Sequence, residues 1–260
     1  MKVLITGISG TIGSQLKELL EKSGNQVMGW DRKKVPFTDY YAMESYLKEA
    51  MPQVVYHLAV PSKPTGMENE GWLVNYQWTS ELAWLCRTLN IQFIFISTVM
   101  VFSNQAKGPF TPESRADASE GYGYEKRLAE ERVFYQHPGA TVIRLGWQIS
   151  TGPGTNNMVD FIENRIKNDG LVSCSTLWYP ACSYLSDTVK VLEWVQKQPP
   201  GLYMFDSNEK WSFYQIAFAL NQIHGKKWKI VPGDNFVYDQ RMQDSRLPKY
   251  SLSAHLKTLK

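Results

Sequence analysis

Short apolar runs alternate with amphipathic segments along the first 150 residues. Runs of apolar and β-branched residues predict strands at 2–6, 26–30, 53–59, 91–98 and 141–145. Apolar residues at helical spacing predict helices at 14–22, 40–50 and 75–89, and a further helix carries Tyr122. The run at 91–98 is continuously apolar, as expected of a strand that is buried on both faces. This alternation is typical of an α/β fold with a doubly wound parallel sheet.

The pattern changes after Gly152-Pro-Gly154. Helices are predicted at 158–167, 187–196 and 211–224, and a strand at 202–205, whereas 174–184 is irregular and the tail lacks strong order. We therefore expect a first domain at 1–150 and a smaller lobe at 151–260, interleaved in one compact unit with a ligand cleft between them.

Three glycines follow the first predicted strand and open the first predicted helix. Gly7, Gly10 and Gly13 have a G-x-x-G-x-x-G spacing, a variant of the dinucleotide fingerprint. Glycine lets the backbone turn tightly and approach a pyrophosphate, which the positive N-terminus of a helix attracts. The glycines alone would fit an ordinary loop, but strand, turn and helix in this order predict a dinucleotide site.

The residues after the second and third predicted strands bear on the same ligand. Asp31 lies eighteen residues after Gly13 and could bind an adenosine ribose, which favours NAD. The adjacent Arg32 could neutralise a 2′-phosphate, which favours NADP, so the choice stays open. Ala59 is small enough to let a cofactor approach, and His57 just before it is interpreted as a packed core residue.

Composition excludes several classes of protein. The net charge is only +3 over 260 residues, with one dense basic stretch at 224–229, which we interpret as a solvated turn and not a nucleic-acid site. The sequence has no signal-peptide pattern and no apolar run of about 18 residues, so we expect a cytoplasmic protein without a membrane span. Three cysteines without a C-x-x-C pair indicate reduced thiols, and four scattered histidines predict no metal site.

Tyr122 and Lys126 are the best candidates for chemistry. Four residues separate them, so on a helix the phenol and the ammonium lie one turn apart on the same face. A nearby positive charge favours the phenolate, so we expect Lys126 to lower the pKa of Tyr122 and make it a proton donor or acceptor. With 14 tyrosines such a pair also arises by chance. Thr98, at the end of the 91–98 strand, should reach the same sheet edge as Tyr122.

The motifs in this order resemble the short-chain dehydrogenase/reductase superfamily, in its extended branch. The chain is similar in particular to the dTDP-4-dehydrorhamnose reductase group. The segments that carry this resemblance are Ser97-Thr-Val-Met-Val-Phe102, Phe110-Thr-Pro-Glu113, Tyr122-Gly-Tyr-Glu-Lys126, Arg144-Leu-Gly-Trp147 and Arg246-Leu-Pro-Lys-Tyr-Ser-Leu252. They span almost the whole chain, and they imply a Rossmann-type sheet with a smaller C-terminal substrate-binding lobe.

The resemblance implies an NAD(P)H-dependent reductase that acts on a keto group of a nucleotide-activated sugar. Tyr122 would protonate the ketone oxygen, Lys126 would hold the nicotinamide ribose, and Thr98 would hydrogen-bond the carbonyl oxygen. Val99 and Trp147 would contact the sugar. The residues that would bind NADP(H) or NAD(H) are Gly7, Gly10, Thr11, Ile12, Gly13, Asp31, Arg32, Leu58, Ala59, Tyr122 and Lys126. A homodimer is compatible with this reading.

Two departures from the group's pattern keep other functions open. Val99 and Met100 replace an Asp and a Tyr, which puts the rhamnose precursor itself in question, and Pro36 replaces a carboxylate near the adenine site. One alternative is an epimerase or dehydratase that retains its NAD, because the same scaffold supports those reactions. The other is a regulatory subunit that binds a dinucleotide without turnover, like the β subunit of methionine adenosyltransferase, although Thr98, Tyr122 and Lys126 are intact.

Overall fold

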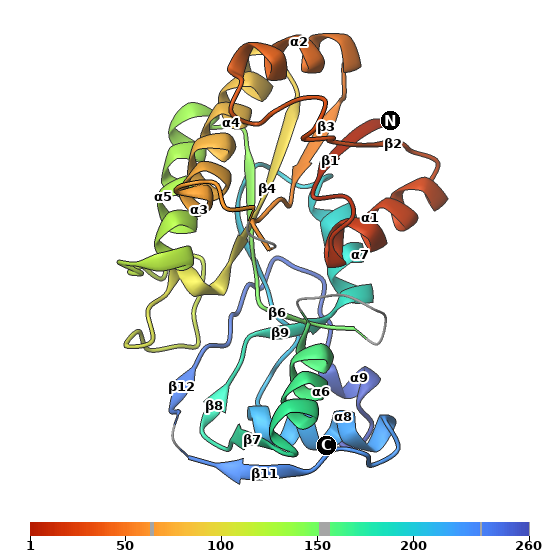
Figure 1. The fold of residues 1–260 in the computed structure, drawn as a ribbon, viewed down its shortest axis with the longest axis vertical. Coiled ribbons are helices and arrows are strands. Elements are labelled where there is room, and N and C mark those ends of the chain that lie inside the picture. The colour runs from red at the N-terminus through yellow and green to blue at the C-terminus, as the bar shows by residue number, and fades with distance from the viewer. Residues whose placement is uncertain (63–64, 151–156, 235, 260) are drawn as a thin grey trace. The chain divides into compact units, whose positions relative to one another are not determined.

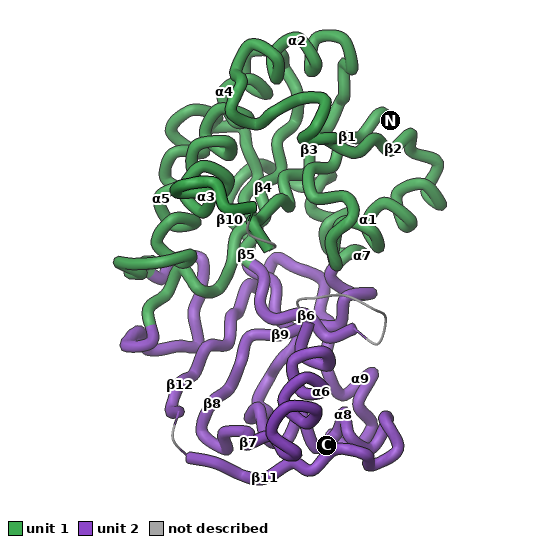
Figure 2. The backbone as a smooth tube through the Cα atoms, viewed as in Figure 1, with its two compact units in different colours: residues 1–103, 115–144, 189–203 green, residues 104–114, 145–188, 204–260 purple. Residues whose placement is uncertain are grey.

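The computed structural model describes residues 1–62, 65–150, 157–234 and 236–259 (Figure 1). The Gly152-Pro-Gly154 segment lies outside the described residues. The chain folds as two compact units (Figure 2). Unit 1 comprises residues 1–103, 115–144 and 189–203, and unit 2 comprises residues 104–114, 145–188 and 204–260.

A six-stranded sheet forms the centre of unit 1. Its strands are β1 (Lys2–Thr6), β2 (Gln26–Gly29), β3 (Val54–His57), β4 (Gln92–Thr98), β5 (Thr141–Leu145) and β10 (Gly201–Phe205). Their spatial order is β10-β5-β4-β3-β1-β2, and β1 pairs in parallel with both β2 and β3. The chain runs from β1 outward to β2 and then returns to β3 on the other side of β1. Such a reversal is the point at which doubly wound sheets bind ligands, at the carboxyl ends of the strands.

Helices cover both faces of this sheet (Figure 1). They are α1 (Thr11–Lys22), α2 (Tyr40–Ala50), α3 (Glu70–Trp72), the π-helical turn η1 (Leu73–Trp78), α4 (Thr79–Thr88), the 3-10 turn η2 (Val99–Val101), α5 (Gly121–Gln136) and α7 (Leu185–Val195). Helices α4 and α5 lie on one side of the strands, and α1 and α7 lie on the other. The predicted doubly wound sheet is confirmed.

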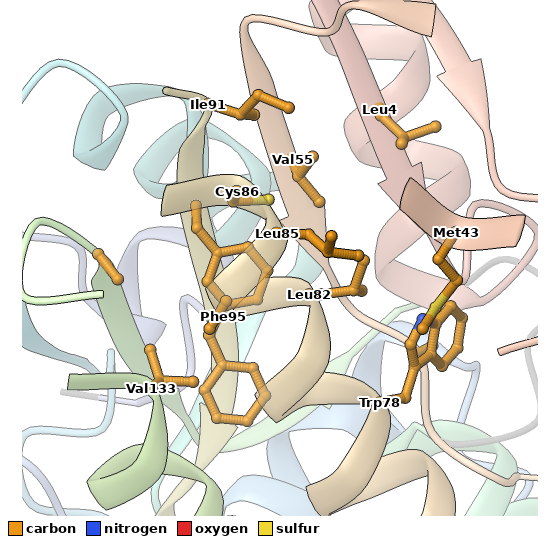
Figure 3. Close-up of a cluster of buried hydrophobic side chains, with 14 of the residues drawn as sticks. Leu4, Met43, Val55, Trp78, Leu82, Leu85, Cys86, Ile91, Phe95 and Val133 are labelled. Carbon is orange, nitrogen blue, oxygen red and sulfur yellow. The ribbon is translucent and has the colours of Figure 1, made fainter. Parts of the chain in front are cut away.

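One hydrophobic core cluster of unit 1 lies between the sheet and helices α2, α4 and α5 (Figure 3). Leu4, Val55 and Phe95 point from three strands toward Leu82 and Leu85 of α4, and all five side chains are fully buried. Burying apolar surface stabilises the fold by roughly 25 cal/mol per Å². Trp78 is buried in this core, whereas Trp84 is 42% exposed.

Unit 2 combines short strands and helices around a separate core. Its elements are β6 (Trp147–Ile149), α6 (Met158–Asp169), β7 (Val172–Ser175), β8 (Trp178–Tyr179), β9 (Cys182–Tyr184), α8 (Phe213–Ile223), β11 (Ile230–Gly233), β12 (Tyr238–Asp239) and α9 (Leu252–His255). Three parallel pairs form: β6 with β9, β7 with β11, and β8 with β12. The core contains Ile149, Ile162, Cys174 and Ile216.

Local signals explain the helices of unit 2. Asn157 accepts a hydrogen bond from the backbone N–H of Asp160 at the start of α6, and Gly170 ends this helix with a φ of 73°. Ser212 and Gln215 form a reciprocal capping box at the start of α8. Both helices were predicted from sequence to within three residues at each end.

Two sequence expectations differ from the observed architecture. The stretch 174–184, expected to be irregular, contains β8 and β9, and the tail contains β11, β12 and α9. Their strands are two to four residues long, and their partners lie far away in the sequence, so local periodicity does not reveal them. Residues 104–114 belong to unit 2 and residues 189–203 to unit 1, so the two units interleave along the sequence, as expected. The expected boundary at residue 150 stays a prediction.

Candidate active site

The three glycines form a tight turn between β1 and α1. Gly7 has a φ of 71°, and the backbone N–H of Gly10 donates to the carbonyl oxygen of Gly7 at 2.9 Å. A Cβ atom on Gly13 would lie 2.2 Å from that same carbonyl oxygen, and one on Gly7 would lie 3.1 Å from the Cα of Ala59. The turn therefore requires glycine for steric reasons, and it abuts the end of β3.

The N-terminus of α1 is suited to an anion. Gly10 is the N-cap and offers no side chain, and the first turn, which begins with Thr11 and Ile12, contains no acidic residue. The first backbone N–H groups of a helix have no intrahelical acceptor, and the helix dipole is positive there. This cradle, left open by the absent Cβ atoms, fits the diphosphate of a dinucleotide.

Thr6 and His57 fix the two strand ends that border the glycine turn. The backbone N–H groups of Leu58 and Ala59 donate to Oγ1 of Thr6 at 3.1 and 3.2 Å. The same oxygen lies 2.8 Å from Nδ1 of His57, whose Nε2 lies 2.9 Å from Oγ1 of Thr79. The predicted location of His57 in the core is confirmed, because its side chain is fully buried.

The hydrogen bonds of His57 define its protonation. The Thr79 hydroxyl donates to the carbonyl oxygen of Asn75 at 2.9 Å, so it accepts a hydrogen bond from Nε2–H of His57. Nδ1 of His57 then accepts from the Thr6 hydroxyl. Burial, with a smaller contribution from the charge of Lys126, holds the pKa of His57 well below its usual value. His57 is thus a neutral structural residue.

Asp31 and Arg32 lie on an exposed loop after β2. The carboxylate of Asp31 accepts a hydrogen bond from the backbone N–H of Lys33 at 3.0 Å. Both Asp31 and Arg32 remain accessible to a ligand, so the loop keeps the features that favour NAD and those that favour NADP.

Thr98 ends β4 and begins the turn η2. Its Oγ1 accepts a hydrogen bond from the backbone N–H of Met100 at 3.2 Å, and its side chain is partly exposed. The start of α5 packs against this turn, because a Cβ atom on Gly123 would lie 2.0 Å from the carbonyl oxygen of Met100. Gly123 thus permits the close approach that brings the turn of Thr98 next to the helix of Tyr122.

Tyr122 and Lys126 lie one turn apart on α5, as predicted. The Lys126 side chain extends over β4, with its Nζ 4.0 Å from the centroid of the Phe95 ring, and the residue is only 1% exposed. Burial lowers the pKa of Lys126 to about 7, although the carboxylates of Glu130 and Glu125 oppose this effect. Lys126 is therefore partly protonated at neutral pH.

A buried ion pair between Glu130 and Arg144 lies one helical turn beyond Lys126 on α5. Arg144 on β5 binds Glu130 in a bidentate arrangement, with contacts of 2.6 and 3.0 Å, and the two residues are 4% and 5% exposed. The guanidinium also lies 5.0 Å from the ring of Phe102. Because both charges are satisfied by each other, the pair fixes α5 against the sheet.

The prediction that Lys126 lowers the pKa of Tyr122 is wrong. Burial raises the pKa of the phenol, and the Glu125 carboxylate raises it further. The sequence pattern gave the spacing of the two groups but not the desolvation, which disfavours phenolate and ammonium alike. Tyr122 is a neutral phenol at physiological pH, which is the form that donates a proton.

Glu125 lies on α5 between Tyr122 and Lys126, and the sequence motifs did not single it out. Nδ2 of Asn75 donates to its Oε2 at 2.8 Å, and a Cβ atom on Gly71 would lie 2.9 Å from its Oε1. Asn75 is 2% exposed and belongs to the π-helical turn η1. Such turns occur often at functional sites. The sequence feature that could have indicated Glu125 was its position three residues after Tyr122.

Two residues expected to contact a sugar have different environments. Val99 is 4% exposed and belongs to the core of unit 1, whereas its neighbour Met100 is 50% exposed. Trp147 lies in unit 2 among other aromatic rings, with ring centroids 5.2 Å from Phe161 and 6.0 Å from Trp178. Trp147 thus forms part of an aromatic cluster that is only partly buried.

The described part of the chain contains no group of three His, Cys, Asp or Glu side chains placed to hold a metal ion. Cys86, Cys174 and Cys182 are buried and unpaired by disulfides. Within the same residues, no helix has the length and apolar character needed to cross a membrane.

The fold and the site define the class of the protein. A doubly wound sheet and a glycine turn at its switch point are the features of a Rossmann-type dinucleotide-binding protein. The chain belongs to the family of the RmlD substrate binding domain, whose model matches residues 1–257.

Known proteins support this assignment. The chain is 25% identical to the spore coat polysaccharide biosynthesis protein SpsK of Bacillus subtilis, over 98% of this chain and 89% of that protein. It is 29% identical to a dTDP-4-dehydrorhamnose reductase of Streptomyces griseus, over 64% of this chain and 56% of that protein. The structure of the Bacillus anthracis dTDP-4-dehydrorhamnose reductase in complex with NADP has the same fold, with a TM-score of 0.84, 19% identity, and coverage of 98% and 96% of the two chains.

Proposed function

We propose that this protein is an NAD(P)H-dependent reductase of a keto group on a nucleotide-activated sugar. The observation that carries the proposal is the arrangement on α5, where a neutral Tyr122 and a buried Lys126 lie one turn apart beside the turn of Thr98. Membership in the RmlD family and the relatives named as sugar-nucleotide reductases support the substrate class.

The glycine turn would hold the cofactor. The first N–H groups of α1, from Thr11 to Gly13, would bind the diphosphate, and Gly7 and Ala59 leave room for its close approach. Asp31 would accept hydrogen bonds from the adenosine ribose, and Arg32 would pair with a 2′-phosphate. When bound, the reduced nicotinamide supplies the hydride.

Tyr122 would act as the general acid. The Tyr122 hydroxyl gives its proton to the carbonyl oxygen as the carbonyl carbon receives the hydride, so the ketone becomes a secondary alcohol. The Thr98 hydroxyl donates a hydrogen bond to the same oxygen and orients the substrate. Lys126, when protonated, holds the nicotinamide ribose and stabilises the phenolate that forms after proton transfer.

Other predictions from the sequence also belong to this proposal. Trp147 would contact the sugar, and the exposed Met100 replaces the buried Val99 as the side chain of η2 that would meet a ligand. The expected division into a cofactor-binding and a substrate-binding lobe, the cytoplasmic location, the absence of nucleic-acid binding and the homodimer remain predictions.

The proposal is tested by two measurements on one sample. The purified protein is titrated separately with NADH and NADPH by fluorescence, and a panel of nucleotide keto-sugars is then added. We expect binding, followed by loss of the near-ultraviolet absorbance of the reduced nicotinamide with one of the sugars. Binding without turnover would favour an enzyme that retains its NAD or a regulatory subunit, and no binding would contradict the dinucleotide site.

A further inference from the structure

The ammonium of Lys126 lies against the ring of Phe95. Its Nζ is 4.0 Å from the ring centroid, well inside the distance of about 6 Å at which the face of an aromatic ring attracts a cation. Lys126 is 1% exposed and Phe95 is fully buried. The attraction between a cation and a ring is stronger when water is excluded, so burial of both partners strengthens this contact.

Phe95 is itself fixed within the sheet. It is paired with His57 in the parallel register of β4 and β3, so the two side chains lie side by side on one face. Their ring centroids are 5.9 Å apart, with an angle of 24° between the rings. Both nitrogens of His57 lie within hydrogen-bond distance of threonine hydroxyls, and the imidazole is neutral. His57 therefore restrains the ring of Phe95 without repelling the ammonium of Lys126.

We propose that Phe95 is a positioning residue, whose ring face holds the ammonium of Lys126 in place over β4 for binding of the cofactor. Lys126 Nζ forms no ion pair and no hydrogen bond with any other described residue, so the ring is the contact that fixes its charged end. A ring face attracts the charge as a whole, whereas a carboxylate would accept hydrogen bonds from the N–H donors that a ribose needs. The benefit to cofactor binding rests on the proposed function, but the attraction between ring and charge does not.

The titratable groups near Lys126 do not replace the ring. Glu130 is bound by Arg144 through two short contacts, and Glu125 accepts a hydrogen bond from a side-chain amide of η1. Tyr122 is a neutral phenol. The two carboxylates raise the pKa of Lys126 without forming an ion pair with it in the described structure. Direct contact with the charged end thus comes from Phe95.

The ring acts on Lys126 in two opposite ways. As part of the apolar surroundings it excludes water and disfavours the ammonium, and burial accordingly lowers the pKa of Lys126 to about 7. The negative electrostatic potential of its face favours the ammonium. Fluorine in place of the ring hydrogens withdraws electrons from the face and changes the shape of the ring little. Fluorination of Phe95 therefore weakens the attraction and leaves the burial almost unchanged.

The proposal is tested by NMR titration of the protein without cofactor or sugar. Lysine labelled with ¹³C at Cε reports its own ionisation, and the signal of Lys126 is assigned by its loss in Lys126→Met. Mono-, di- and trifluorophenylalanine are incorporated in place of Phe95. The matched control carries the same residues in place of Phe93, which is fully buried on the same face of β4 and lies 6.1 Å from the ring of His57. No described cation lies over the ring of Phe93.

We expect the titration midpoint of Lys126 to fall with each fluorine added at Phe95, by about half a pH unit or more for the trifluorinated ring. With fluorine at Phe93, the midpoint should stay near 7. If the trifluorinated protein does not fold, the mono- and difluorinated proteins still establish the trend. Midpoints that are constant across the Phe95 series, or that fall equally in the Phe93 series, would overturn the proposal.

This test is separate from that of the reductase. Since no cofactor or sugar is present, a protein that reduces no keto-sugar can still show the shift, and an active reductase can fail to show it. In a protein that binds NADH, the affinity near pH 7 should decrease in the same order as the midpoints, because fewer molecules carry the ammonium. An NADH affinity that stays constant while the midpoint falls would contradict the positioning role of Phe95.

Discussion

The glycine turn after β1 and the first turns of α5 both belong to the proposed site, but different physical effects determine their properties. The turn contains no titratable side chain, and its geometry depends on backbone atoms that leave no space for a Cβ at Gly13. The α5 face contains a phenol and an ammonium that burial shifts toward their neutral forms. Changes in the turn should therefore act through shape at every pH, and changes on α5 should act through protonation.

The largest effect is expected for Tyr122→Phe. The variant lacks the proton donor, so the turnover number should fall by roughly 10²- to 10⁴-fold, while NADH affinity changes little because the ring remains. Steady-state kinetics and fluorescence titration measure the two quantities. Tyr124→Phe, on a different face of α5, is the matched control and should stay active. A normal turnover number in Tyr122→Phe would show that Tyr122 is not the proton donor.

Gly13→Ala should weaken cofactor binding at all pH values. The new methyl group would overlap the carbonyl oxygen of Gly7, so the turn must open, and we expect cofactor affinity to drop by about tenfold or more. Gly139→Ala, at an exposed position with ordinary space around the new atom, serves as the control. Equal affinities of the two variants for NADH would show that the turn does not hold the cofactor.

Thr98→Val should have a smaller effect on catalysis. The variant keeps the shape of the side chain but loses the hydroxyl, and one hydrogen bond contributes about 0.5–1.5 kcal/mol, or up to roughly tenfold in rate. The effect should appear in kcat/KM for the sugar, whereas NADH affinity remains. Thr98→Ser should restore most of the activity, and a Thr98→Ser variant as impaired as Thr98→Val would assign the loss to packing.

The pH dependence of stability provides the mildest test of the α5 face. The pKa of Lys126 is about 7 in the folded protein and about 10.5 in the unfolded chain, so between these values the unfolded state binds the extra proton. Stability from this group therefore falls as pH drops from above 10 to 7. Lys126→Met should unfold at a higher temperature than the wild type, by a few degrees at pH 6 and by progressively less toward pH 10. A melting-temperature difference that is independent of pH would contradict the lowered pKa of the buried Lys126.

Sequence patterns predicted the parts of the fold that depend on local order. The long strands and helices of unit 1 follow their periodicity, and the glycine turn follows from steric rules that any chain obeys. The pairing of β7 with β11 did not follow, because the two strands are separated by more than fifty residues and each is four residues long.

The pKa values of the candidate site residues could not be predicted from their spacing in the sequence. A spacing of four residues placed Lys126 beside Tyr122, but the pKa of Tyr122 depends on burial and on Glu125, which only the packed structure specifies. The contact between Asn75 and Glu125 joins elements fifty residues apart. A motif therefore identified the proposed reacting groups, and the tertiary structure determines their protonation.

The most direct test of the account is a transfer experiment with a reduced nicotinamide cofactor that carries deuterium in the transferred position. The protein is mixed with this cofactor and a nucleotide keto-sugar, and the sugar product is analysed by mass spectrometry and NMR. The account predicts one deuterium at the former carbonyl carbon, at a rate that Tyr122→Phe strongly reduces. A product without deuterium, or a sugar that remains a ketone while the cofactor stays bound and unreacted, would contradict it.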